Sequence, residues 1–221
     1  MPRYSKAPWD TTISLFRDLA PEITVRQPVG YLVPQEWTSA IDRLGIHGVR
    51  FRRFARAWSD SVEQTRVVTW KTQALFEGHR PDSAITVETV HRYRTYRPGD
   101  VWVPLDQRSA LVAVHLFEAQ APDGLFQWNF FDTIFLKVEG ADDYVMEPIA
   151  RKMMSEDPRL AAEFQAKLAA EPAFAKDPAA RLDWFYRRSR WADPEQNLIP
   201  VARALHRPPD SVLAPESAAA R

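Results

Sequence analysis

The sequence predicts an α+β fold, with a mixed β sheet in the first half of the chain and helices in the second half. Residues 61–76 and 84–96 alternate apolar and polar side chains, as half-exposed strands do. Residues 158–170 are rich in alanine and place Leu160, Phe164 and Leu168 four positions apart, which is the spacing of one helical face. Strand patterns therefore come first along the chain and helix patterns follow, an order typical of α+β proteins.

Residues 28–124 are expected to form the sheet-rich part of one domain that spans residues 28–206. An apolar run from Val29 ends at Pro34, residues 35–44 have helical spacing, and residues 49–54 alternate apolar side chains with arginine. These three segments predict a β-α-β unit. Residues 77–82 are turn material between two antiparallel strands, and residues 109–117 form an apolar run that fits a buried helix.

Residues 125–206 are expected to form the helical part of the same domain. An aromatic cluster opens it, and residues 139–155 fit one helix that is interrupted near Pro148. Asp177 and Pro178 have the composition of another helix start. Residues 1–27 are predicted to be an irregular lead-in with one short amphipathic piece at 11–19, and residues 207–221 a flexible tail.

Composition excludes several functional classes. Lysine plus arginine equals aspartate plus glutamate at 29 each, so no net positive field favours nucleic acid. The absence of cysteine excludes disulfides, thiol catalysis and cysteine-bound zinc, but fits several compartments. No apolar run has the length of a membrane span, and the first ten residues do not have the pattern of a signal peptide. We therefore expect a soluble chain without membrane insertion, and its localisation stays open.

His115 and Glu118 have the spacing of a zinc-binding His-x-x-Glu pair, because residues three apart on a helix share one face. A working zinc site also needs a third ligand and a general base, and the only later histidine is His206. The sequence thus predicts a packed histidine beside a structural glutamate, with no metal site and no cofactor.

Two further groups of side chains have the composition of functional sites. Glu118, Asp123, Asp132 and His47 supply carboxylates and an imidazole for acid-base catalysis, although sequence spacing alone cannot bring them together. Residues 183–191 mix arginine with aromatic side chains, as single-strand nucleic-acid sites do, yet acidic residues interrupt them. For this segment we expect a structural or docking role, in which it holds the helical half against the sheet half. Within it the role falls to Trp184, Tyr186, Arg187 and Arg188. A structural or docking role is also expected for Trp128 and Phe131 of the aromatic cluster.

A series of ordered motifs over about residues 28–203 resembles the carboxy-terminal region of large bacterial zinc carboxypeptidase-like metallopeptidases. The motifs are 28–37, Leu44 with 47–49, 103–104 with 106–107, 117–118 with 121–123, 128–132, 144–150, 174–175, 181–188 and 200–203. Two positions depart from the family pattern: Ala202 stands where the closing motif has glycine, and His115 stands where the family has an apolar residue.

The resemblance implies that the family's catalytic residues lie in a domain upstream of this region, so none of them transfers to a position here. It suggests an exported, periplasmic parent protein. A natural module, a truncated gene and a fragment all fit the chain. The function expected from the sequence is a non-catalytic accessory module that docks on, stabilises or gates a peptidase domain or holds peptide substrate. The alternative is a stand-alone enzyme that uses Glu118, Asp123, Asp132 or His47 in a pocket near the aromatic cluster.

Overall fold

The computed structural model describes residues 7–17, 20–136 and 142–215 of the 221-residue chain, and they form an α+β fold. The strands are β1 (Gly30–Val33), β2 (Arg52–Arg53), β3 (Trp58–Thr72), β4 (Asp82–Tyr96), β5 (Val101–Pro104) and β6 (Leu198–Ala204). The α-helices are α1 (Thr38–Ile46), α2 (Ala110–Phe117), α3 (Asp143–Glu156), α4 (Pro158–Ala170), α5 (Pro172–Lys176) and α6 (Pro178–Tyr186). Short 3-10 helices span Asp132–Phe135 and Asp210–Val212.

The six strands form one sheet in the order β2-β5-β1-β6-β3-β4. The predicted β-α-β unit is present in split form, because β1 and β2 each pair antiparallel with β5, which lies between them. All pairs among the described strands are antiparallel, where the sequence interpretation expected a mixed sheet. The difference arises because strands from later in the chain, β5 and β6, occupy the positions beside β1.

The long hairpin of β3 and β4 confirms the predicted antiparallel pair. Strand β3 begins and ends earlier than the predicted range 61–76, and β4 begins two residues before the predicted range 84–96. The turn between them contains Gly78 at a φ of 83°, a backbone conformation that favours glycine. The sequence located this hairpin because alternation and turn chemistry are both local signals.

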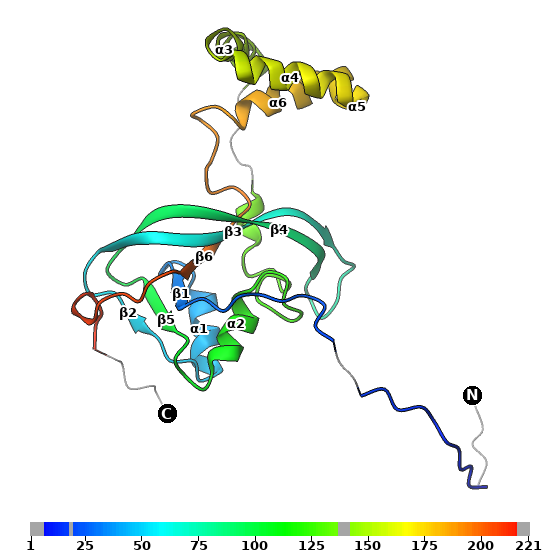
Figure 1. The fold of residues 1–221 in the computed structure, drawn as a ribbon, viewed down its shortest axis with the longest axis vertical. Helices are drawn as coiled ribbons and strands as arrows, with labels where there is room; N and C mark the ends of the chain where they lie inside the picture. The colour runs from blue at the N-terminus through cyan, green and yellow to red at the C-terminus, as the bar shows by residue number, and fades with distance from the viewer. Residues whose placement is uncertain (1–6, 18–19, 137–141, 216–221) are drawn as a thin grey trace.

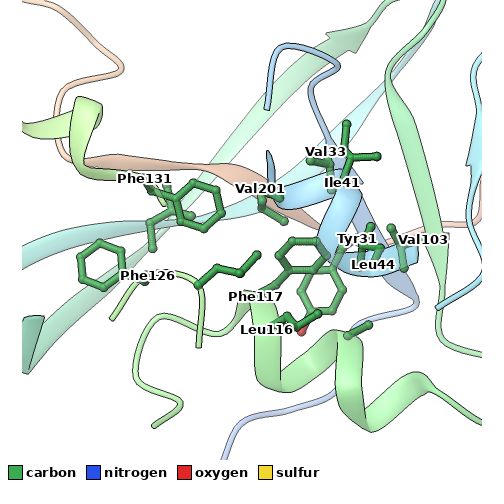
Figure 2. Close-up of a cluster of buried hydrophobic side chains, with 14 of the residues drawn as sticks. Tyr31, Val33, Ile41, Leu44, Val103, Leu116, Phe117, Phe126, Phe131 and Val201 are labelled. Carbon is green, nitrogen blue, oxygen red and sulfur yellow. The ribbon is translucent and has the colours of Figure 1, made fainter. Parts of the chain in front are cut away.

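Helices α1 and α2 cover one face of the sheet and form the main core with it (Figure 1). Ile41 and Leu44 of α1 and Leu116 and Phe117 of α2 pack toward Tyr31 on β1, as Figure 2 shows. Residues 110–117 are therefore helical, as the apolar run predicted, but only one face of the helix is buried, and Leu111 on it is 76% exposed. On the opposite face the Trp102 ring lies where a Cβ at position 30 would stand, so only glycine fits at Gly30.

The segment after β6 covers the opposite face of the sheet. Leu213 is 6% exposed and packs with Phe54 and Trp102 in a second core, and the Ala214 N–H donates to the Arg53 carbonyl at 2.8 Å. The prediction of a flexible tail from residue 207 is therefore corrected for residues 207–215. In this proline-rich segment Leu213 fills a space beside Phe54 and Trp102 on the sheet. Residues 216–221 lie outside the described part of the chain.

Helices α3 to α6 pack on one another around a third core, and Figure 1 shows them as a group beyond the long hairpin. Pro148 lies inside α3, which continues through it. Strand β6 then returns to the middle of the sheet, so the prediction that residues 125–206 are helical fails for residues 198–204.

The lead-in has neither helix nor strand in its described residues, 7–17 and 20–27. The amphipathic piece predicted at 11–19 is not helical over 11–17, where Ile13 and Phe16 are exposed, and positions 18–19 lie outside the described residues. Its apolar side chains have no core to pack against, which removes the main source of helix stability. Within the described segments, no helix combines the length and apolar character that crossing a membrane requires.

Candidate functional site

A cavity of about 770 Å³ lies between α2, the sheet and the lead-in. Its floor is the helix-covered face of the sheet, with Thr65 on β3 and Thr89 on β4. Helix α2 and the loop after it form one wall, and residues 22–26 of the lead-in form another. The remaining lining side chains are Val87, Leu111, Val114, His115, Glu118, Ala119, Gln120, Ala121, Pro122 and Arg203. This size and mixture of apolar and polar groups are typical of small-ligand sites.

The sheet register places a row of polar side chains at one end of the cavity. Arg203 on β6 is opposite Tyr31 on β1 and, on its other side, opposite Glu63 on β3. Residues directly opposite in antiparallel strands project from the same face, so all three side chains project toward α2. Glu118 directly follows the last turn of α2 and reaches the row from the helix side of the sheet. We call Tyr31, Glu63, Glu118 and Arg203 the Glu118 cluster.

Glu118 is held from two sides. The Tyr31 hydroxyl donates to Glu118 Oε1 at 2.6 Å, and Arg203 Nε lies 3.7 Å from the same oxygen. Arg203 Nε is also 3.8 Å from Glu63 Oε2, and Arg203 Nη2 donates to the Arg26 carbonyl in the lead-in. Arg203 therefore connects the floor of the cavity to its outer wall.

Burial is the largest reason why the pKa of Tyr31 is raised far above its ordinary value, and the nearby negative charge of Glu118 raises it further. Tyr31 thus keeps its proton and acts as a hydrogen-bond donor to the carboxylate. The cluster holds two carboxylates and one guanidinium, which leaves a formal charge of one negative unit at this end of the cavity.

Of the four residues proposed for acid-base catalysis, only Glu118 lines the cavity. His47 is exposed at the end of α1, and Asp123 is exposed in the turn after α2, where its N–H binds Gln127 Oε1 at 2.7 Å. Asp132 begins a 3-10 helix near Asp82, and its pKa is raised by partial burial and by the charge of Asp82. The fold therefore does not assemble these four groups into one site.

Of the six residues expected to have a structural or docking role, Phe131 and Trp128 lie in the sheet half. Phe131 is buried in the main core, with its ring 5.2 Å from that of Trp37. Trp128 is half-buried and makes an edge contact with His79 at 5.5 Å.

The other four structural residues belong to the helical half. Trp184 is buried among residues of α3 to α6, and Arg188 stacks on its ring at 3.8 Å. Arg187 pairs with Asp183 at 2.6 Å, and the Tyr186 hydroxyl donates to the Trp191 carbonyl at 3.2 Å. The expectation that this segment holds the helices against the sheet is corrected, because the core around Trp184 contains helical residues alone among those described.

His115 also lines the cavity, one turn before Glu118, but its side chain is exposed, so the prediction of a packed histidine is wrong. Glu118 is engaged by Tyr31 and Arg203, as a structural glutamate would be. Among the described residues, no group of three or more histidine, aspartate or glutamate side chains is arranged to hold a metal ion.

Sequence reasoning missed Tyr31, Arg203 and the lead-in segment 22–26 as parts of a site. One signal was present, since Arg203 is a lone charged residue in the apolar run 198–204. A charge within such a run requires a partner when the run becomes a central strand. The identity of that partner is set by strand order, which the run itself does not contain.

In comparisons with known proteins, no protein-family model, no curated protein and no solved structure matches the chain.

Proposed function

We propose that this chain is a non-catalytic accessory module that holds peptide, of the kind that the resemblance to zinc carboxypeptidase-like metallopeptidases implies. The observation that carries the proposal is the cavity beside α2, which offers apolar side chains, three threonine hydroxyls and one buried carboxylate. An extended peptide presents the matching chemistry, because it has apolar side chains together with regularly spaced N–H donors and carbonyl acceptors.

The state of Glu118 supports holding rather than hydrolysis. Tyr31 and Arg203 both engage Glu118 Oε1, which fixes the carboxylate in place and leaves Oε2 to accept from a ligand.

The alternative proposal is an enzyme that uses Glu118, Asp123, Asp132 or His47. It has less support, because the last three side chains lie outside the cavity lining. A second accessory role, docking on a peptidase domain of a bacterial exported protein, is supported by the lead-in, whose Trp9, Ile13 and Phe16 are more than three-quarters exposed.

The proposal is tested by titrating the full chain with short N-acetylated, C-amidated peptides and following amide shifts by NMR. We expect saturable shifts at Thr65, Thr89 and His115, and an unchanged peptide mass after prolonged incubation. Absence of saturable binding would refute the peptide-holding role, and cleavage that resists chelators would favour the enzyme.

A matched pair of variants locates the binding. Thr89 lines the cavity, whereas its neighbour Glu88 projects from the other face of β4, since successive side chains alternate along a strand. Thr89→Trp should fill the cavity and abolish binding, and Glu88→Trp should leave it intact. Equal loss or equal retention in both variants would show that the peptide binds elsewhere.

A further inference from the structure

The Glu118 cluster has one more negative charge than positive charge. Arg203 is shared by Glu63 and Glu118, at 3.8 and 3.7 Å, so its single positive charge faces two carboxylates. The side chain of Glu118 is only 11% exposed, and what is exposed of it faces the cavity. A buried, incompletely compensated carboxylate is costly, and a ligand that brings a positive charge removes part of that cost.

Two of the three guanidinium nitrogens of Arg203 already face other groups of the protein. Its Nε atom is inaccessible and makes no hydrogen bond among the described residues, although it lies between the two carboxylates. Its Nη2 atom donates to the Arg26 carbonyl. The guanidinium is therefore committed to the cluster and to the lead-in.

Glu118 retains an open acceptor. Both of its interactions within the described chain are made by Oε1, and Oε2 has no hydrogen-bond partner among the described residues. The other ionisable residues of the lining, Glu22, Arg26 and His115, include one carboxylate and one guanidinium that balance each other. The residual charge that a ligand meets is thus the negative charge at Glu118.

We infer that the cavity selects a ligand with an alkylammonium or guanidinium group, which binds Glu118 Oε2 while its apolar stem contacts Val87 and Val114. The inference rests on the proposed function, for which it names the substrate class: a peptide with a lysine or arginine side chain. A charge-assisted hydrogen bond to a buried carboxylate is about twice as strong as a neutral one, so the cation dominates selectivity. A free alkylamine carries the same chemistry from another source.

The test compares blocked tripeptides in which alanines flank a central lysine, norleucine or glutamate, together with free pentylamine. Norleucine is the matched control, because it keeps the apolar stem of lysine and lacks the ammonium. We expect the lysine peptide to bind the native chain at least about tenfold more tightly than the norleucine peptide. The glutamate peptide should bind most weakly.

Glu118→Gln keeps the acceptor for Tyr31 and removes the charge, so it should abolish the preference for lysine while norleucine binding stays the same. Glu63→Gln is the matched control, since it removes the same charge from Arg203 at a residue outside the lining. Because it neutralises the cluster but keeps the direct bond to Glu118 Oε2, it should weaken the preference for lysine without abolishing it. If Glu118→Gln does not fold, a tripeptide with a central Nε-acetyllysine, which keeps the stem of lysine and lacks its charge, replaces the variant. Binding of this peptide to the native chain as tightly as the lysine peptide would count against the inference.

The outcomes separate the two claims. Equal binding of all three peptides would overturn the cation inference and leave the peptide-holding role standing. Binding of none would refute the peptide-holding role, and tight binding of pentylamine by Glu118 would then still support the cation inference. Failure of both peptides and pentylamine would refute both claims.

Discussion

Tyr31 donates a hydrogen bond of 2.6 Å to Glu118, a residue 87 positions later in the chain. The bond joins a central strand to the end of α2, and Glu118 also faces Arg203 from β6. Three elements that are distant in sequence therefore meet at one carboxylate. Because this carboxylate also lines the cavity, the stability of the fold and the charge of the candidate site depend on the same contact.

Tyr31→Phe tests how much this contact stabilises the fold. The variant keeps the ring contact with Phe117 at 5.2 Å and removes only the hydroxyl. A hydrogen bond to a charged group is typically worth about 1.5–3 kcal/mol, so the free energy of unfolding should fall by about that amount in urea denaturation. Tyr93→Phe, at a tyrosine that is mostly exposed, is the control and should have no effect. Equal stability of Tyr31→Phe and the native chain would mean that the bond is not formed in solution.

Trp184→Ala tests whether the helical half has a core of its own. Trp184 packs against Phe164 at 5.3 Å and Phe185 at 4.8 Å, all within α4 and α6. Removing a buried tryptophan typically costs about 3–5 kcal/mol. We expect hydrogen exchange to accelerate in α3 to α6 and to remain slow in β1 and β5.

The control for Trp184 is Trp191→Ala, because Trp191 is about half exposed. It should change exchange rates little. Loss of protection in the sheet as well as the helices would show that the two cores unfold as one cooperative unit, contrary to the separation seen here.

The buried carboxyl of Asp82 should make the stability of the fold depend on pH. Its side chain is buried at the start of β4, where it accepts a hydrogen bond of 2.9 Å from Thr72, and burial raises the pKa of the carboxyl. A raised pKa in the folded state means that the group favours folding below its unfolded pKa of about 3.9, and that this contribution is lost as pH rises through the folded pKa. Asp82→Asn, which stays neutral, should therefore be more stable than the native chain near neutral pH.

The advantage of Asp82→Asn should shrink as the pH falls toward the unfolded pKa, since the native aspartate then also becomes neutral. Urea denaturation of both chains across this pH range measures it. Asp10→Asn, in the exposed lead-in, is the control. A constant difference between Asp82→Asn and the native chain at every pH would contradict the assignment.

Leu213 tests the corrected end of the chain. Leu213→Ala should destabilise the fold by about 2–5 kcal/mol, because the side chain fills the second core beside Phe54 and Trp102. Leu205 is partly exposed, and Leu205→Ala is expected to have a much smaller effect. Thermal melts compare the two variants, and equal melting temperatures would restore the prediction of a flexible tail.

The sequence was sufficient where the signal is local. Alternation over residues 61–76 and 84–96 with turn chemistry between them specified the β3–β4 hairpin, and helical spacing specified α1 and α4. It was insufficient where a partner comes from elsewhere in the chain. Strand β6 contains Pro200 and Arg203, so its pattern is weak, and its place in the sheet depends on β1 and β3.

The candidate site follows the same division. Glu118 and His115 attracted attention because they have the spacing of a zinc pair, which the lack of further ligands argued against, and nothing in that spacing indicated a cavity wall. Tyr31 and Arg203 reach Glu118 only through the antiparallel register of β1 and β6, which depends on tertiary packing.

The most direct test of a non-catalytic peptide-holding module is calorimetric titration of the full chain with the blocked lysine tripeptide, followed by mass spectrometry of the recovered peptide. We predict saturable binding to one site, loss of the lysine preference in Glu118→Gln, and a recovered peptide of unchanged mass. A cleaved peptide, or no detectable binding to the native chain, would contradict this account of the protein.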